Sequence, residues 1–291
     1  MTRPDWFDET LFPYESRFLD VDGARIHYVD EGEGPVLLML HGQPTWSFVF
    51  RHVIDRLRDR FRCVALDYPG FGLSTAPPGY DFRIASQVLM VEGFVQRLDL
   101  DELTPVVHDW GGPIGMALAV RHPERIRALV IGNTFAWPAD RLVPKLLSLV
   151  MGGPLGHLLV RRLDVFTRTF LPKQGMRKRE LTEAEHAMYL APHPTPASRV
   201  PLHVMPREIR AARPLLEEVE AGLGRVADRP ALLLWPTEDV AFDEAELHRW
   251  QSTLSNARTV LLEGAGHFLW GDDPDAIADA IREWHPEMSA L

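Results

Sequence analysis

Residues 108–112, with the sequence HDWGG, follow the apolar run LTPVV and precede the pattern GGPIGMALAV. The stretch therefore lies where a strand turns sharply into a helix, a geometry that exposes one side chain for nucleophilic attack. Here that side chain is Asp109. An ordinary aspartate has a pKa of about 3.9 and is ionised at neutral pH, so it could attack carbon without the help of a base. The alternative is that Asp109 only caps the helix that begins at Trp110, because aspartate is a favoured N-cap.

Two further side chains complete a set that could carry out acid–base chemistry. His267 lies in the glycine-rich turn EGAGHF after the last strand pattern, and Asp239 follows the strand pattern ALLLW. A carboxylate in such a loop is often only a turn former. In the chain order Asp109, Asp239, His267, however, the three match a nucleophile, an acid that orients a base, and the base itself.

Short apolar runs alternate with amphipathic helical patterns along most of the chain. This alternation predicts a mostly parallel, eight-stranded sheet covered by helices on both faces. The pair Asp22-Gly23 predicts a hairpin that adds antiparallel strands at one edge. We expect strands at residues 16–21, 24–30, 36–40, 63–67, 104–108, 126–133, 231–235 and 258–263.

The alternation is broken between residues 136 and 225, where several helical patterns but no clear strand occur. About 90 residues are too many for a simple connection between two strands. We therefore expect a helical cap at 136–225, over the carboxyl ends of the strands, where open α/β sheets bind ligands. The main domain would then comprise residues 1–135 and 226–291.

Several motifs together resemble those of α/β-hydrolases. The turn VHDWGG resembles their nucleophile elbow, although Val107 stands where glycine is usual, and HGQP at 41–44 resembles the loop that supplies half of an oxyanion hole. With DYPGFGLS at 67–74 and EGAGHF, the chain resembles the haloalkane dehalogenases across nearly its full length. The resemblance is weakest through the cap.

That resemblance implies a role for each catalytic candidate. Asp109 would attack the carbon that bears the halogen and form an alkyl ester, and His267, oriented by Asp239, would activate water to hydrolyse it. The backbone N–H groups of Gln43 and Trp110 would stabilise the oxyanion. Some family members carry a glutamate after the sixth strand as the acid, but this chain has Asn133 there, so Asp239 is the better candidate.

The resemblance also implies two side-chain donors for the departing halide. Trp110, next to the nucleophile, offers an indole N–H that can only donate. Many family members have asparagine where this chain has Gln43, which keeps the amide donor on a longer side chain. Trp137, the only tryptophan in the predicted cap, is the reserve candidate. Less specific interpretations are that Trp110 is a core aromatic and that Gln43 only stabilises its own loop.

Other functions fit the same residues less well. An epoxide hydrolase would share the aspartate nucleophile but needs two cap tyrosines, and only Tyr189 falls in the predicted cap. A serine esterase is disfavoured because the elbow carries no serine. A cofactor-free oxygenase on this scaffold and a non-catalytic binding protein stay open, since fold alone never proves function.

Composition limits the possible partners. The formal net charge is −10 and the basic residues are scattered along the 291-residue chain, so we expect no binding to nucleic acid or to membranes. The longest apolar stretch, at 146–160, is interrupted by Gly-Gly-Pro and is shorter than a spanning helix. The single cysteine, Cys63, cannot form an internal disulfide. No metal or phosphate-loop motif occurs, so we expect a cytoplasmic, cofactor-free enzyme that acts on small apolar halogenated substrates and water and releases halide.

Overall fold

The computed structural model describes residues 3–289, and the side chains of residues 3–285. The chain opens with the predicted hairpin, in which β1 pairs antiparallel with β2 and Val21 faces Ala24. Between them, Asp22 and Gly23 have φ angles of 47° and 83°. Two-residue hairpin turns whose twist matches that of the strands need positive φ at both positions, which glycine adopts freely and aspartate tolerates. The hairpin prediction is confirmed.

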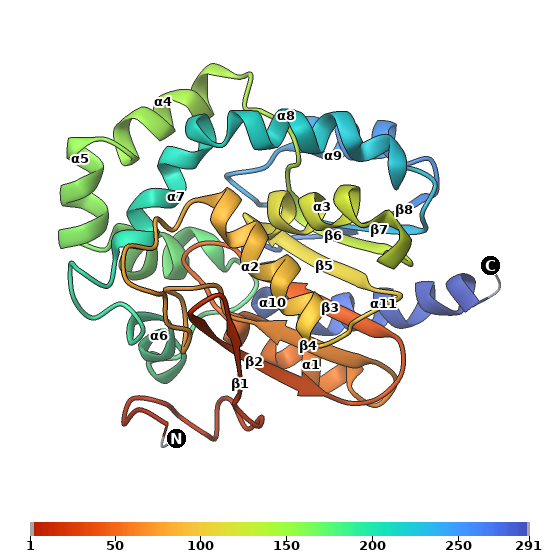
Figure 1. Ribbon diagram of the computed structural model, residues 1–291, viewed down its shortest axis with the longest axis horizontal. Helices are drawn as coiled ribbons and strands as arrows, with labels where there is room; N and C mark the ends of the chain where they lie inside the picture. The colour runs from red at the N-terminus through yellow and green to blue at the C-terminus, as the bar shows by residue number, and fades with distance from the viewer. Residues whose placement is uncertain (1–2, 290–291) are drawn as a thin grey trace.

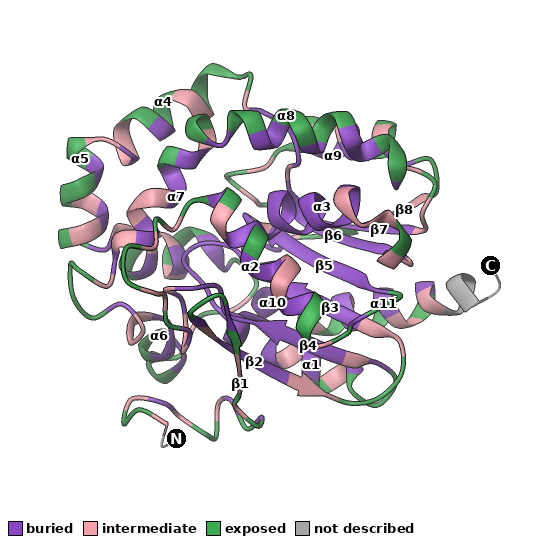
Figure 2. Ribbon diagram, in the orientation of Figure 1, coloured by how far each residue is buried: buried purple, intermediate pink, exposed green. Residues whose placement is uncertain are grey.

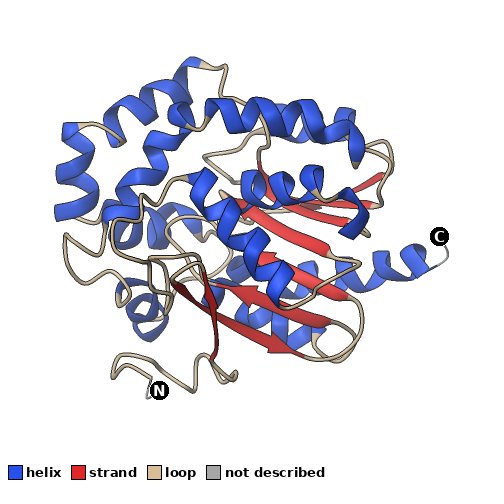
Figure 3. Cartoon of the chain, viewed as in Figure 1, coloured by secondary structure: helices blue, strands red, loops and turns tan. Residues whose placement is uncertain are grey.

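All eight strands join one sheet in the order β1-β2-β4-β3-β5-β6-β7-β8 (Figures 1 and 3). Every pair from β4 to β8 is parallel, and only β1–β2 and β2–β4 are antiparallel. The predicted mostly parallel sheet is therefore confirmed. Its strands are β1 (Arg17–Val21), β2 (Ala24–Glu31), β3 (Val36–Leu40), β4 (Arg62–Leu66), β5 (Thr104–Asp109), β6 (Leu129–Thr134), β7 (Ala231–Pro236) and β8 (Ala257–Leu262).

Helices cover both faces of the sheet, so its central strands are buried almost throughout. Helices α2, α3 and α9 pack on one face and α1 and α11 on the other, and each side forms its own apolar core (Figure 1). The flanking elements are η1 (Ser47–Phe50), α1 (Arg51–Leu57), α2 (Ile84–Arg97), α3 (Gly111–Arg121), η2 (Pro123–Arg125), α9 (Glu244–Thr253), α10 (Leu269–Asp272) and α11 (Pro274–Ser289).

The segment between β6 and β7 is helical throughout its regular elements and lies along one edge of the molecule in Figure 1. We propose that residues 136–225 form the cap expected from the sequence. Helix α8 of this segment packs against α3, which joins the cap to the main domain. The cap elements are α4 (Leu142–Met151), α5 (Pro154–Gly156), the π-helical η3 (His157–Arg162) and η4 (Phe166–Gly175), α6 (Glu183–Leu190), α7 (Val200–Ala211), α8 (Arg213–Gly222) and η5 (Leu223–Arg225).

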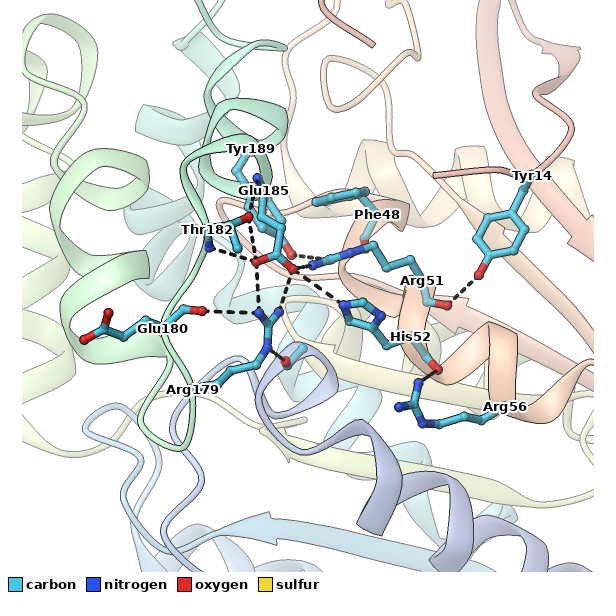
Figure 4. A network of polar contacts seen from close by, with 11 residues as sticks. Tyr14, Phe48, Arg51, His52, Arg56, Arg179, Glu180, Thr182, Glu185 and Tyr189 are labelled. Carbon is cyan, nitrogen blue, oxygen red and sulfur yellow. Dashed lines mark hydrogen bonds and ion pairs between the residues drawn. The ribbon is translucent and has the colours of Figure 1, made fainter. Parts of the chain in front are cut away.

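A buried ionic network fastens the cap to the main domain (Figure 4). Glu185 of α6 is 5% exposed, and its carboxylate pairs with the buried guanidinium of Arg51 in α1. Arg179 donates to both carboxylate oxygens, at 2.9 and 3.0 Å. The Glu185 carboxylate also accepts from the backbone N–H of Thr182 at 2.9 Å, which closes a capping box at the start of α6. The carboxylate is thus paired on several sides.

We expect Glu185→Gln to destabilise the fold by about 3–5 kcal/mol, because it leaves buried Arg51 without its counter-charge. Burial opposes ionisation of Glu185, but His52, Arg179, Thr182 and Arg51 outweigh it and hold the pKa well below its ordinary value. The folded state therefore binds this proton more weakly than the unfolded state. The stabilisation is present above the unfolded pKa of about 4.3 and is lost as the pH falls through the folded pKa.

Thermal unfolding of Glu185→Gln measured from neutral to acidic pH tests this expectation. Glu183→Gln, which changes an exposed residue in the first turn of the same helix, is the matched control. Equal melting temperatures for the two variants at neutral pH would show that the network contributes no net stability.

Candidate active site

Asp109 occupies a strained turn at the end of β5. Its φ is 49°, a left-handed conformation that a non-glycine residue rarely adopts, and the β5–β6 register shifts between His108 and Asp109. The crowding leaves no room for side chains at the adjacent glycines. A Cβ on Gly42 would lie 2.3 Å from Asp109 Cβ, and one on Gly111 would lie 2.0 Å from the Leu40 carbonyl oxygen. The strand-to-helix turn predicted from the sequence is present, and no side-chain cap hydrogen bond is formed at the start of α3.

The Asp109 carboxylate is enclosed but supported by backbone donors. The Gln43 N–H donates to Asp109 Oδ1 at 2.9 Å, and the Trp110 N–H also favours the ionised carboxylate. These are the two N–H groups predicted to stabilise an oxyanion. Burial raises the pKa of Asp109 above its ordinary value, although His267 and both N–H groups oppose the rise. A poorly solvated carboxylate with few competing partners is a good nucleophile.

His267 and Asp239 meet Asp109 at the same edge of the sheet. His267 follows β8, and its Nε2 lies 3.8 Å from Asp109 Oδ2. On the other side of the ring, Nδ1 lies 3.1 Å from Asp239 Oδ2, in the loop after β7. The side chains of His267 and Asp239 are 3% and 0% exposed. The structure therefore brings together all three predicted catalytic side chains, with the imidazole between two carboxylates.

Two neighbouring residues that were not predicted from the sequence hold this arrangement. The Asn133 amide, near the end of β6, donates to Asp239 Oδ2 at 2.5 Å and to the His267 carbonyl at 2.8 Å. His108 Nε2 lies 2.9 Å from the same His267 carbonyl. Because β5, β6 and β7 are adjacent and parallel, residues at their carboxyl ends must converge. The position of Asn133 at the end of β6 is thus the signal that could have identified it.

The two carboxylates raise the proton affinity of the imidazole. Burial would raise the pKa of Asp239, but His267 and Asn133 outweigh it and hold that pKa below its ordinary value. Burial likewise disfavours the imidazolium of His267, but the Asp239 and Asp109 carboxylates outweigh it and raise the pKa of His267. Free enzyme thus favours an ionised Asp239 beside a more basic His267.

We expect the pKa of His267 to fall once Asp109 is esterified, because an ester removes one of the two charges that raise it. Only neutral His267 can accept a proton from water, so ester hydrolysis slows as the pH falls through this pKa. In rapid mixing, the acid limb of the hydrolysis step should lie at lower pH than the NMR titration of His267 in the free enzyme. Coincident midpoints would mean that the Asp109 charge does not act on the imidazole.

The predicted halide donors Trp110 and Gln43 differ in whether their side-chain N–H groups already have an acceptor. Among the described residues, Trp110 Nε1 has no acceptor within hydrogen-bond distance, and its ring packs edge-on against Phe135 at 5.3 Å. Gln43 Nε2 donates to the carbonyl of Leu202 in α7 at 2.7 Å. An amide nitrogen carries two N–H groups, so one remains for a halide. The carbonyl of the cap residue Leu202 thus fixes the longer side chain of Gln43.

Trp137, the reserve candidate, lies in a different environment. Its indole N–H donates to Glu246 Oε2 at 2.8 Å, its ring packs against Trp250, and the Arg249 guanidinium lies 4.2 Å from the ring centroid. An indole has a single N–H. The structure therefore uses the only donor of Trp137 to attach the start of the cap to α9, and does not bring it to Asp109.

The tyrosines relevant to epoxide chemistry do not form a pair of free donors. Tyr189, in α6, is buried in the network of Figure 4, where its hydroxyl accepts from Arg51 at 3.3 Å. Tyr68 lies close enough to Asp109 for the carboxylate, together with burial as the larger cause, to raise its pKa. Its buried hydroxyl has no partner within the described part of the chain, and it comes from the loop after β4 rather than from the cap.

No group of three or more His, Cys, Asp or Glu side chains within the described residues could hold a metal ion. The polar atoms of the site are instead used within the triad and by its supports Asn133 and His108. The arrangement can therefore supply a carboxylate nucleophile, a base and backbone oxyanion donors from the chain itself.

Residues 35–274 match the family described as the alpha/beta hydrolase fold. Haloalkane dehalogenase 2 of Mycobacterium tuberculosis is 45% identical over 281 residues, which cover 95% of this chain and 96% of that protein. The structure of an ancestral haloalkane dehalogenase superposes with a TM-score of 0.86 at 29% identity, over 94% of this chain and 100% of the other. The chain belongs to the α/β-hydrolase fold family and, within it, to the haloalkane dehalogenases.

A relative with a different name is also similar along the whole chain. The cis-3-alkyl-4-alkyloxetan-2-one decarboxylase of Shewanella oneidensis is 32% identical, covering 97% of this chain and 92% of that protein. The fold and the family resemblance predicted from the sequence are confirmed. Because of this similarity, experiments must distinguish a haloalkane substrate from a cis-3-alkyl-4-alkyloxetan-2-one.

Proposed function

We propose that this protein is a haloalkane dehalogenase, which hydrolyses a carbon–halogen bond to an alcohol and a halide ion through an alkyl ester of Asp109. The observation that carries the proposal is the placement of His267 between the Asp109 and Asp239 carboxylates. The 45% identity to a dehalogenase supports it. The substrate class is a small, apolar halogenated molecule, with water as the second reactant.

In the first step, an Asp109 oxygen attacks the carbon from the side opposite the halogen. The C–O bond forms as the carbon–halogen bond breaks, and the halide leaves with the bonding electron pair. Burial, which raises the pKa of Asp109, also removes water that would otherwise stabilise the nucleophile. Trp110 Nε1 and the second N–H of Gln43 meet the negative charge that develops on the halogen.

In the second step, His267 Nε2 takes a proton from water as the resulting hydroxide attacks Cγ of the Asp109 ester. The backbone N–H groups of Gln43 and Trp110 stabilise the oxyanion. Collapse of this intermediate breaks the bond to the alcohol oxygen, which takes up the proton of the newly added hydroxyl group, and so regenerates the Asp109 carboxylate. His267 then loses its proton to solvent, so the net products are alcohol, halide and one proton.

Aromatic side chains around the triad suit an apolar substrate. The rings of Phe170, from the cap, and Phe242, from the loop after β7, lie 5.7 and 5.8 Å from the His267 ring. Phe135 packs against Trp110 at 5.3 Å and stacks on Phe242 at 5.8 Å, which continues this aromatic lining. Such a lining binds alkyl chains and weakens competition from bulk water.

We expect Gln43→Ala to slow halide displacement by about 10–100-fold, the loss typical of one hydrogen bond to a charged group. Ester hydrolysis should change less, because the backbone N–H at position 43 remains. Pre-steady-state measurement of halide release and alcohol formation separates the two steps. Gln96→Ala, at an exposed site on α2, is the control. An unchanged displacement rate would assign the second donor to another group.

The first test of the function is bromide release from primary bromoalkanes of short to medium chain length. We expect release by the wild type, and none by Asp109→Asn. A cis-3-alkyl-4-alkyloxetan-2-one, assayed in parallel for loss of carbon dioxide, tests the activity named for the Shewanella relative. Decarboxylation without bromide release, from folded protein, would overturn the proposal.

A further inference from the structure

The outer surface of the cap is unusually apolar. Of the eleven large hydrophobic side chains that are strongly exposed within the described residues, eight lie between residues 142 and 163. We call these eight the leucine surface. Five are on α4, namely Leu142, Val143, Leu146, Leu147 and Leu149, and the others are Leu155, Leu158 and Leu163. Such a concentration of exposed apolar side chains in one segment is typical of an interaction site.

Helix α4 turns its apolar side toward solvent and a polar residue toward the protein. A helix on the surface of a globular protein turns its apolar stripe toward the core. In α4 the buried residue is the polar Ser148, whereas Leu142 and Val143 are 78% and 74% exposed. Figure 2 shows α4 and α5 at the outer edge of the molecule, with exposed residues along both. The apolar side of α4 therefore faces out of the protein.

Cations without carboxylate partners border the leucine surface. No carboxylate lies within ion-pair distance of Lys145, Arg162, Arg207 or Arg210 in the described part of the chain, although Lys145 donates to a backbone carbonyl. A cleft of about 370 Å³ beside Leu149 is lined by Arg207 and Arg210. Its shape and charge are suited to an anionic headgroup next to an apolar surface.

The segment that carries the leucine surface is positively charged, whereas the whole protein is negatively charged. Residues 136–179 carry nine lysines and arginines but only two aspartates, whereas the chain has a net charge of −10. One of the two, Asp164, is buried beside Arg199, with Nε 3.5 Å from the carboxylate. Four of the nine cations, Arg141, Arg168, Lys178 and Arg179, pair with carboxylates. Lys145 and Arg162, beside the leucine surface, keep an unbalanced positive charge, which the net charge of the chain conceals.

The helices that carry the leucine surface are suited to lying on a bilayer rather than crossing it. Within the described residues no single helix is long and apolar enough to span a membrane. The pair Leu142–Met151 and Pro154–Arg162 reaches that length and hydropathy only together, and it bends by 59° at its break. Short helices with leucines on one side and cations at the margin bind in the plane of the interface. A second copy of the chain is a poorer occupant, because two positively charged surfaces would face each other.

We propose that the leucine surface of the cap binds the interface of an anionic lipid bilayer. The leucines enter the boundary between headgroups and acyl chains, and the bordering lysines and arginines contact lipid phosphates. This proposal is the alternative to the expectation of no membrane binding that was drawn from the net charge. It is independent of the dehalogenase activity, because none of the residues that carry it contacts the triad.

The experiment is co-sedimentation of the full chain with vesicles of phosphatidylcholine, with and without phosphatidylglycerol. We expect binding to the anionic vesicles that weakens with added salt. The double variant Leu146→Gln/Leu149→Gln should lose at least about tenfold in partitioning, as two leucines no longer enter the acyl region. Arg207→Glu/Arg210→Glu should lose at least about fivefold per charge removed.

The matched control for the leucine variant places the same substitution at another exposed leucine. Leu89 on α2 is 55% exposed, as is Leu146, so Leu89→Gln should bind like the wild type. Bromide release from a soluble bromoalkane shows that each variant is folded. No binding to phosphatidylglycerol vesicles, or binding that the leucine variant retains, would overturn the proposal. Self-association without lipid that is abolished by Leu146→Gln/Leu149→Gln would also overturn it and assign the surface to contacts between copies.

Discussion

Asp109→Asn is expected to abolish halide release, with a loss of at least about 10⁴-fold in turnover, as for removal of a nucleophile in other hydrolases. The amide has nearly the size of the carboxylate but no charge, so it cannot displace a halide. The fold should be preserved, since burial already raises the pKa of Asp109 and a neutral side chain is easier to bury there. We therefore expect bromide release to be lost while the melting temperature stays close to that of the wild type.

Intact mass must accompany this measurement, because deamidation of the introduced amide would restore the nucleophile and mimic residual activity. Turnover by protein whose mass still corresponds to the Asp109→Asn variant would exclude Asp109 as the nucleophile. A large fall in melting temperature would instead indicate that the carboxylate is needed for the fold of the elbow.

His267→Phe is expected to stop turnover after the first step and to accumulate the alkyl ester on Asp109. Displacement of halide needs no base, whereas ester hydrolysis needs a group that takes the proton from water. A phenyl ring is compatible with the surroundings, because Phe170, Phe242 and Phe268 already pack around His267. One equivalent of bromide should be released per protein, with turnover reduced by at least about 10⁴-fold.

Intact mass after incubation with a reactive bromoalkane should rise by the mass of one alkyl group, and peptide mapping should locate it at Asp109. His157→Phe, on the exposed surface of the cap, is the control and should show neither the alkyl adduct nor the loss of turnover. Bromide release without an adduct would argue for direct attack of water on the substrate and against the two-step mechanism.

The elements that could be predicted from the sequence are those with local causes. The pair Asp22-Gly23 between two strand patterns favours a hairpin turn, and the glycines after Asp109 indicate a turn too crowded for side chains. The order Asp109, Asp239, His267 predicted a catalytic set because the carboxyl ends of adjacent parallel strands meet at one edge. The structure brings the same three residues together.

The features that could not be predicted depend on contacts between distant segments. The bond from Asn133 to Asp239 requires the order of strands in the sheet, and that from Gln43 to Leu202 requires the position of the cap. The single N–H of Trp137 is used by Glu246, which lies 109 residues further along. The apolar stretch at 146–160 was visible in the sequence, but its periodicity cannot show whether leucines face the core or solvent.

Under the proposed role of Gln43 as a halide donor, its hydrogen bond to the carbonyl of Leu202 makes a backbone atom of the cap part of the site that receives the leaving group. Exchange of this cap for that of a relative would therefore alter bond cleavage as well as access for the substrate. Chimaeras that preserve the backbone at position 202 should keep the wild-type ratio of bromide to chloride turnover, and those that displace it should not. We therefore expect leaving-group preference to change together with substrate access when the cap is exchanged.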